Sequence, residues 1–187
     1  MRIIGGEHRG RRLFAPEGQA TRPTSEKVRE ALFDILGSRV EGATFCDLYA
    51  GTGAVGLEAL SRGAASCVFV ERQGKALGAL RRNIEMLGAA RAARVLAMDA
   101  LQALKVLEDE GHQTDLLFCD PPYADARWPV ILAGLGERTI LAPRALVLVE
   151  HAVKVLPACP RGMEQGRSYK YGDTGLTIFE KTVRSEG

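Results

Sequence analysis

The 187-residue chain contains only four cysteines, and they stand far apart at positions 46, 67, 119 and 159. No Cys-x-x-Cys pair occurs, so nothing in their spacing points to a bound metal. Cys46, Cys67 and Cys119 lie in apolar, strand-like runs, where a free cysteine behaves as a small hydrophobic residue. We therefore expect reduced thiols, a cytoplasmic location and no metal site.

Long apolar runs are also absent. No run approaches the roughly 18 residues that a membrane-spanning helix needs. The N-terminus lacks the apolar core of a signal peptide, so we expect neither a membrane segment nor a leader. The chain shows no repeat and no linker long enough to divide it. We expect one main domain over residues 40–183, preceded by a short N-terminal piece over residues 1–39.

Net charge is low, at +2, which is too weak by itself to indicate a nucleic-acid partner. The distribution of charge is more informative. The first dozen residues contain one acidic residue, Glu7, and four arginines, which are Arg2, Arg9, Arg11 and Arg12. Such a cluster is typical of a surface that binds phosphate. The alternative is a solvated, disordered N-terminus, and charge alone does not separate the two.

The N-terminal piece has its own predicted structure. Residues 2–13 are typical of two short strands around a glycine-rich turn. Thr24 or Ser25 is a suitable N-cap for a helix whose apolar residues recur at helical spacing up to Leu36. Gly37 ends that helix. We expect this piece to be able to lie across the ligand face of the main domain.

The main domain alternates strands and helices. Apolar strands that alternate with helices predict a mostly parallel sheet covered on both faces, an α/β fold. Its last two strands predict a closing antiparallel hairpin, and the sheet then has seven strands. The expected strands are 44–48, 66–70, 94–97, 114–119, 145–149, 165–171 and 176–179, and the expected helices are 54–61, 75–87, 100–107 and 128–135.

A glycine-rich turn follows the first strand of this domain. Gly51, Gly53 and Gly56 fit the pattern G-x-G-x-x-G after a strand and at the start of a helix. Glu71 ends the next strand, so the pattern alone is compatible with a dinucleotide site that has Glu71 on the ribose hydroxyls. Glycines by themselves are weak evidence, because any tight strand-to-helix turn favours them.

Acidic residues narrow the choice of ligand. Asp47 lies four residues before Gly51 and would repel a pyrophosphate at the helix N-terminus. S-adenosylmethionine instead carries an ammonium and a sulfonium, and no phosphate. Asp99 closes the third strand and could accept a hydrogen bond from an adenine amino group. Asp47, Glu71 and Asp99 together favour the methyl donor, although a capping or surface role is the alternative for each one alone.

The segment Asp120-Pro121-Pro122-Tyr123 follows the apolar strand 116–119. Its prolines end the strand, because they cannot donate ladder hydrogen bonds, and the C-terminal edge of such a sheet is where ligands bind. In one interpretation it is a proline turn, with Asp120 as a cap and Tyr123 as packing. In the other, Asp120 and the Pro121 carbonyl bond the two hydrogens of an amino group and aim its lone pair at a methyl donor.

That second interpretation assigns further roles. Tyr123 offers a ring on which a base can stack, worth roughly 1–3 kcal/mol. An ionised Asp120 would stabilise the positive charge that grows on the nitrogen. A base inside a helix would have to be flipped out, or presented in a loop, to reach the site.

Two sets of motifs carry a resemblance that extends from Arg2 to about Lys181. Residues 45–53 and 120–123 together resemble the amino-group class of Rossmann-like S-adenosylmethionine-dependent methyltransferases. Residues 2–6, 9–11 and 22–33 are similar to the bacterial 16S ribosomal RNA guanine-N2 methyltransferase family of the RsmD type. The resemblance implies methylation of the 2-amino group of a guanine in 16S ribosomal RNA, free or within an assembling small subunit. Many relatives have phenylalanine where Tyr123 stands.

Three sets of site residues are expected. Those expected to act in catalysis are Asp120, Pro121, Pro122 and Tyr123. Those expected to contact S-adenosylmethionine are Asp47, Tyr49, Ala50, Gly51, Thr52, Gly53, Glu71, Arg72, Asp99 and Ala100. Those expected to contact RNA are Arg2, Arg9, Arg11, Arg12 and Arg22. The family places the helix near the site, so residues 22–27 could close over the cofactor.

Other functions and residues stay open. The rivals are a DNA adenine or protein glutamine methyltransferase, a nicotinamide-dependent oxidoreductase and a non-catalytic RNA-binding protein. We expect no catalytic role for the scattered His8, His112 and His151, and a structural role for Asn83. Trp128 could line a base pocket or belong to the core. Residues 169–171 could touch RNA or form the surface of the hairpin.

Overall fold

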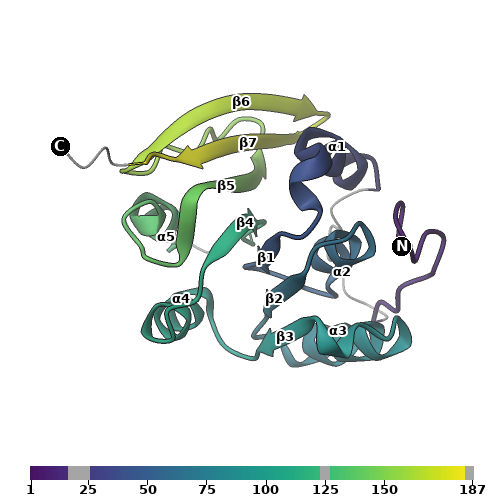
Figure 1. Cartoon of the computed structure of the whole chain (residues 1–187). Helices are drawn as coiled ribbons and strands as arrows, with labels where there is room; N and C mark the ends of the chain where they lie inside the picture. Colours follow the sequence, from purple (N-terminus) through teal and green to yellow (C-terminus); the bar gives the residue numbers. More distant parts are fainter. Residues whose placement is uncertain (17–25, 123–126, 184–187) are drawn as a thin grey trace. The chain divides into compact units, whose positions relative to one another are not determined.

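A computed structural model describes residues 1–16, 26–122 and 127–183 of the chain (Figure 1). The backbone forms two compact units, Met1–Asp99 and Ala100–Gly187. The boundary expected between residues 39 and 40 falls inside the first unit and stays a prediction.

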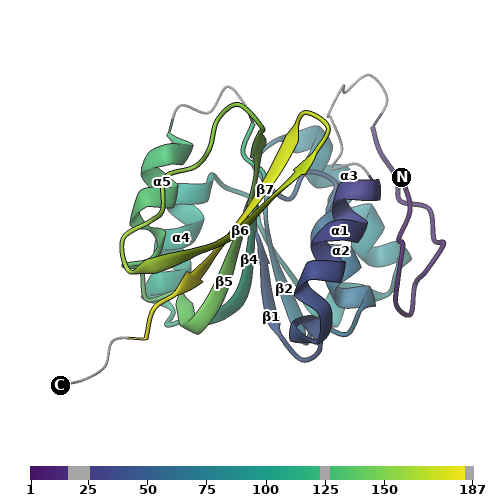
Figure 2. The same cartoon turned by 90° about the horizontal axis from the view of Figure 1, so that it is seen from above.

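The first unit is built on three parallel strands in the order β3-β2-β1. The strands are β1 (Thr44–Asp47), β2 (Ser66–Val70) and β3 (Ala93–Leu96). The helices are α1 (Glu26–Leu36), α2 (Ala54–Ser61) and α3 (Gly74–Met86), with short 3-10 turns at Gly37–Val40 and Ala89–Arg91. Figures 1 and 2 show α2 and α3 on the same side of β1 and β2. Parallel pairing brings the C-terminal ends of these strands to one edge, where the loops predicted to bind ligand begin.

The second unit has two parallel strands followed by an antiparallel hairpin. Its helices are α4 (Ala100–Asp109) and α5 (Trp128–Leu135), and its strands are β4 (Thr114–Cys119), β5 (Leu141–Ala152), β6 (Met163–Tyr171) and β7 (Thr174–Lys181). The strand order is β4-β5-β7-β6, with β4 parallel to β5. Figure 2 shows α4 and α5 on one side of β4 and β5. The α/β class, with parallel strands and a closing antiparallel hairpin, is therefore confirmed.

Some boundaries differ from those expected. The strand expected at 145–149 extends over Leu141–Ala152, because β7 pairs with its C-terminal end as far as Ala152↔Thr174. The two N-terminal strands are reduced to one bridge between Arg2 and Arg12. The hairpin turn is shorter than expected, since Tyr171 already pairs with Thr174 and leaves two residues between the strands.

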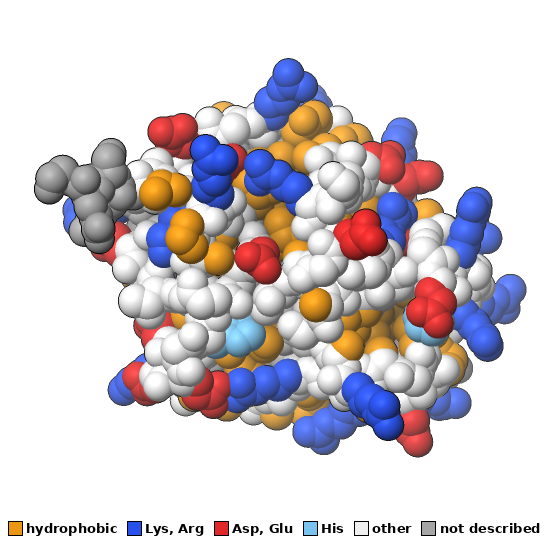
Figure 3. All heavy atoms as spheres, viewed as in Figure 1, with side chains coloured by type: hydrophobic (Ala, Val, Ile, Leu, Met, Phe, Trp, Pro, Cys, Tyr) orange, Lys and Arg blue, Asp and Glu red, His pale blue; other side chains and the backbone are white. Residues whose placement is uncertain are grey.

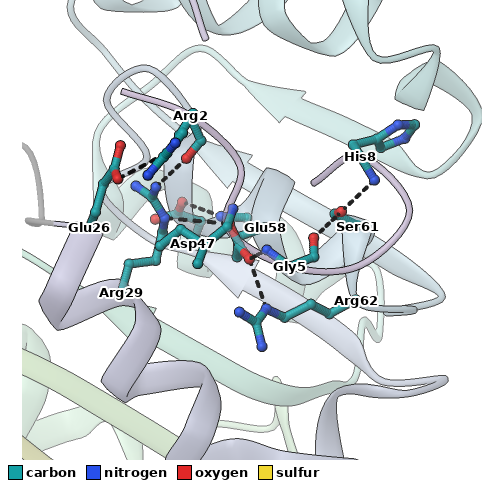
Figure 4. A network of polar contacts seen from close by, with 11 residues as sticks. Arg2, Gly5, His8, Glu26, Arg29, Asp47, Glu58, Ser61 and Arg62 are labelled. Atoms are coloured by element: carbon teal, nitrogen blue, oxygen red, sulfur yellow. Dashed lines mark hydrogen bonds and ion pairs between the residues drawn. The ribbon is translucent and has the colours of Figure 1, made fainter. Parts of the chain in front are cut away.

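The N-terminal segment is held on α2 by the buried carboxylate of Glu58 (Figure 4). Glu58 accepts hydrogen bonds from the backbone N–H groups of Ile4 and Gly5, each at 2.7 Å. It also forms ion pairs with Arg62, at 2.8 Å, and with the fully buried Arg29, at 3.5 Å. Burial lowers the pKa of the Arg29 guanidinium, and the charge of Glu58 opposes that effect. One carboxylate thus joins residues 4 and 5 to α1 and α2.

Most of the buried side chains in the described residues are apolar, as the sequence pattern indicated. Cys46, Cys67 and Cys119 are buried in strands, and Cys159 is exposed. None of the helices in the described ranges is both long and apolar enough to cross a membrane.

Candidate active site

The loop between β1 and α2 depends on its glycines for conformation and space. Gly51 has φ +54° and Gly53 has φ +85°, both in the left-handed region. A Cβ on Gly53 would lie 2.4 Å from Leu80 Cδ1, and one on Gly56 would lie 2.3 Å from Phe69 Cε1. Gly51 has open space around it, so only its backbone conformation calls for glycine. The tight turn and the close packing of α2 on β2 therefore fix the first turn of α2 beside the end of β1.

Asp47 is the last residue of β1 and is almost completely buried. Its Oδ2 accepts a hydrogen bond from the Gly56 backbone N–H at 3.0 Å. Burial raises the pKa of the Asp47 carboxyl to about 7, the nearby charge of Glu71 adds to this, and the Gly56 hydrogen bond opposes it. The first strand thus presents a carboxyl group that titrates near neutral pH. A cation bound beside it would favour its ionised form.

Glu71 follows β2 directly and holds the same loop. Its Oε2 accepts a hydrogen bond from Gly51 N–H at 2.8 Å, and its Oε1 accepts one from Gln73 N–H at 2.6 Å. Each carboxylate oxygen can accept more than one hydrogen bond, so these contacts leave capacity for a ligand hydroxyl. Two acidic side chains therefore hold this region: Glu71 bonds the loop at Gly51, and Asp47 bonds the first turn of α2 at Gly56.

The other residues expected to bind the cofactor are placed as follows. Ala50 and Thr52 are buried in the loop, Tyr49 is half-buried, and Arg72 is exposed. Asp99 is half-buried in the segment between β3 and α4, and Ala100 is the first residue of α4, in the second unit.

Asn83 of α3 supports the loop, in agreement with the structural role expected for it. Its side-chain amide donates to the Thr52 and Phe14 carbonyls, each at 3.0 Å, and its Oδ1 accepts from Phe14 N–H at 2.7 Å. The N-terminal segment and the glycine loop are therefore joined through one fully buried side chain.

The Asp120 segment contributes to a pocket in the second unit. Asp120 follows β4 directly and is half-buried, Pro121 is buried and Pro122 is exposed. The pocket is lined by Asp120, Pro121, Trp128, Glu150, His151, Ala152 and Val155. Trp128, for which the sequence left two interpretations, is half-buried and lines this pocket. Tyr123 lies outside the described residues.

Glu150 and His151 are two pocket residues that sequence reasoning did not select. Both are more than nine-tenths buried. The sequence did hold a signal for them, since they are a pair of polar residues directly after the apolar run of β5. The strand was expected to end at Val149, however, so they were not assigned to the site. His151 Nδ1 lies 2.9 Å from the Ala152 carbonyl oxygen, and its Nε2 lies 2.9 Å from Thr177 Oγ1. A carbonyl oxygen can only accept a hydrogen bond, so Nδ1 is the donor to Ala152. Contacts at both ring nitrogens therefore hold the imidazole in place.

The residues expected to contact RNA are exposed wherever the structure describes them. Arg9, Arg11 and Arg12 are exposed, and Arg2 is exposed while pairing with Glu26 at 3.2 Å. Arg22, and most of the segment 22–27 that could cover the cofactor, lie outside the described residues. Figure 3 shows lysine and arginine side chains dispersed among acidic ones on the face in view. In the described part of the chain, no group of three or more His, Cys, Asp or Glu side chains could hold a metal ion.

Comparison with solved structures defines the class of protein. The structure titled "Putative methyltransferase yhhF from Escherichia coli" superimposes with a TM-score of 0.85 and 32% identity, over 98% of this chain and 99% of that one. An RNA methyltransferase from Salinibacter ruber, solved in complex with S-adenosyl-L-homocysteine, matches with a TM-score of 0.64 at 16% identity, which is a likeness of fold alone. The chain therefore has the Rossmann-like methyltransferase fold.

Sequence comparison then gives the family. Residues 1–180 match the family described as "Conserved hypothetical protein 95". The Bacillus subtilis protein named "Putative rRNA methyltransferase YlbH" is 36% identical, over 97% of this chain and 99% of the relative. The Escherichia coli protein named "Ribosomal RNA small subunit methyltransferase D" is 34% identical, over 100% of this chain and 92% of the relative. The chain belongs to this family, the RsmD-type methyltransferases.

Proposed function

We propose that the protein transfers a methyl group from S-adenosylmethionine to the exocyclic 2-amino group of a guanine in 16S ribosomal RNA. The observation that carries this proposal is the similarity over the whole chain to a ribosomal RNA small subunit methyltransferase, in a chain whose Asp120 and Pro121 line a pocket. RNA within an assembling small subunit is part of the same proposal.

The acidic side chains around the glycine loop suit S-adenosylmethionine. S-adenosylmethionine, when bound, supplies an electrophilic methyl group on a cationic sulfur. The carboxyl groups of Asp47, bonded to the first turn of α2, and of Glu71, bonded to the loop, suit a cationic ligand and would repel a pyrophosphate. Asp99, just before α4, is the residue that we assign to the adenine amino group. This charge pattern favours the methyl donor over the nicotinamide dinucleotides.

Asp120 is assigned to the target amino group. The lone pair of a guanine 2-amino nitrogen is delocalised into the ring, so the group is a poor nucleophile until it is oriented. The Asp120 carboxylate can accept one N–H and the Pro121 carbonyl the other, which directs the lone pair towards the methyl carbon. Positioning of this kind can contribute about 7–11 kcal/mol to lowering the barrier. The carboxylate also stabilises the positive charge that forms on nitrogen before its proton is lost.

A methyl-transfer assay tests the proposal. The full chain is incubated with labelled cofactor and with small ribosomal subunits, naked 16S ribosomal RNA, duplex DNA or protein, and the modified nucleotide is mapped. We expect product on ribosomal RNA, as N2-methylguanine, in at least one RNA form. Product on DNA or protein alone would support the rival amino-group methyltransferases instead.

Asp120→Ala tests the residue assignment. We expect turnover to fall by about 10²–10³-fold, comparable to the loss of one transition-state hydrogen-bond partner. Cofactor affinity, measured by calorimetric titration, should stay within a few-fold. Asp109→Ala, at an exposed position at the end of α4, is the matched control and should keep full activity. Unchanged turnover in Asp120→Ala would remove Asp120 from its assigned role.

A further inference from the structure

Strand register places a second carboxylate beside Asp120. β4 and β5 are parallel, and their last registered pairs are Phe118↔Leu148 and Cys119↔Val149. The residues that follow this last pair are Asp120, directly after β4, and Glu150, within β5. Residues matched in this way on neighbouring parallel strands lie about 5 Å apart and direct their side chains to the same face. Both residues line the same pocket.

Glu150 stands at a rigid position. Its backbone is paired with Leu176 of β7, on the opposite side of β5 from β4, and only 9% of the residue is exposed. Asp120 is less buried and lies where β4 gives way to two prolines. The pocket therefore combines a carboxylate at the strand end with a deeper carboxylate held inside the sheet.

The other side chains of the pocket supply walls. The two ring nitrogens of His151 are engaged by Ala152 O and Thr177 Oγ1, and Ser168 Oγ lies 2.9 Å from that same Thr177 hydroxyl. His151 is thus a fixed wall. Trp128 adds an aromatic surface, and Val155 an apolar one at the exposed rim. This combination suits a flat, aromatic ligand that carries hydrogen-bond donors on one edge.

We propose that Glu150 determines the specificity for guanine by accepting a hydrogen bond from its N1–H. This inference rests on the proposed function and deepens it. Guanine presents two neighbouring donors, N1–H and the 2-amino group, on a single edge. With Asp120 on the amino group, a register-matched carboxylate is well placed to accept the adjacent N1–H. Purines with an unprotonated N1 present a lone pair there, which a carboxylate repels.

The test compares two bases that both carry a 2-amino group. After the methylated nucleotide is mapped, 16S ribosomal RNA is assembled by ligation with either guanine or 2-aminopurine at that position. 2-Aminopurine has an acceptor at N1 in place of the donor. Wild-type protein should prefer guanine strongly. Glu150→Gln provides an amide that can donate to N1, so the ratio of kcat/KM for guanine over 2-aminopurine should fall by roughly 10- to 100-fold.

Two further variants keep the test decisive. Glu150→Asp retains an acceptor, so it should keep the preference for guanine even if its overall rate is lower. Glu164→Gln, at an exposed position on β6, should leave both rates unchanged. A Glu150→Gln variant that slows both substrates equally, or neither, would overturn the assignment. Wild-type protein that methylates no guanine at all would instead overturn the proposed function, a different and recognisable result.

Discussion

The carboxyl group of Asp47 accepts a hydrogen bond from the backbone N–H of Gly56, with 3.0 Å between Oδ2 and the nitrogen. This contact places an ionisable group at the start of α2, where partial positive charge accumulates. Burial nevertheless outweighs the hydrogen bond and raises the pKa of Asp47 to about 7. Its proton should therefore be lost, in the folded protein, near physiological pH.

Asp47 should make the free energy of unfolding depend on pH. Its folded pKa lies above the ordinary value of 3.8, so between about pH 4 and 7 the folded state holds a proton that the unfolded state has lost. This contribution to stability is present at low pH and falls as pH rises through that window, by up to about 1.4 kcal/mol per unit. Asp47→Asn should flatten the profile. Urea unfolding of both proteins at pH 5 and pH 7.5 measures it, and parallel profiles would show that Asp47 does not titrate in this range.

Alanine substitutions at Gly53 and Gly51 should differ in cost. Both residues have positive φ, which costs a non-glycine residue roughly 1–2 kcal/mol. Only the Gly53 methyl would also collide with Leu80, and such overpacking costs a further 1–3 kcal/mol or so. We expect Gly53→Ala to be clearly less stable than Gly51→Ala in denaturant unfolding. Equal losses would mean that α3 can retreat from the loop.

Glu58→Gln should destabilise the N-terminal part of the first unit. The change removes the ion-pair partner of the fully buried Arg29 and places an amide near the N–H groups of Ile4 and Gly5. Breaking a buried ion pair in this way costs about 3–5 kcal/mol. The exposed pair between Arg2 and Glu26 supplies the control, because surface pairs contribute about 0–1 kcal/mol. Chemical denaturation of Glu58→Gln and Glu26→Gln should show this difference, and similar losses would contradict it.

Charge reversal of Arg11 and Arg12 should weaken RNA binding if the N-terminal segment contacts phosphate. Both side chains are exposed. Each phosphate contact that is lost reduces the slope of log K against log salt by about 0.7 on single-stranded RNA. Binding of the Arg11→Glu, Arg12→Glu double variant to 16S ribosomal RNA, measured at several salt concentrations, gives that slope. Lys105→Glu on α4 is the control, and an unchanged slope in the double variant would exclude the contact.

Local pattern was enough to predict most of the fold. The helices Ala54–Ser61 and Trp128–Leu135 and the strands Ser66–Val70 and Thr114–Cys119 have the boundaries that the sequence indicated. These elements have clear apolar runs bounded by glycine, proline or polar residues. Strand β5 was underestimated, because its ends are set by pairing with β4 and β7, and residues 142–144 interrupt the apolar pattern.

Long-range contacts account for what the sequence did not reveal. Glu58 stands in an otherwise apolar helix, and nothing local shows that its partners are the backbone of residues 4 and 5. Glu150 joins Asp120 at the pocket only through the register of two strands that are some thirty residues apart in the chain. Acidic residues at strand ends could be listed from the sequence, whereas the backbone groups that each one binds required coordinates.

The three hydrogen bonds of Asn83 limit how this position could change during evolution. Its amide donates to two carbonyls and accepts from one N–H, across segments 69 and 31 residues away. Aspartate would lose both donors, and glutamine would bring one extra methylene into a fully buried space. Neither of these closely related residues could therefore replace asparagine without a loss of stability. The N-terminal segment and the glycine loop are consequently expected to have diversified together, each constrained by the same side chain.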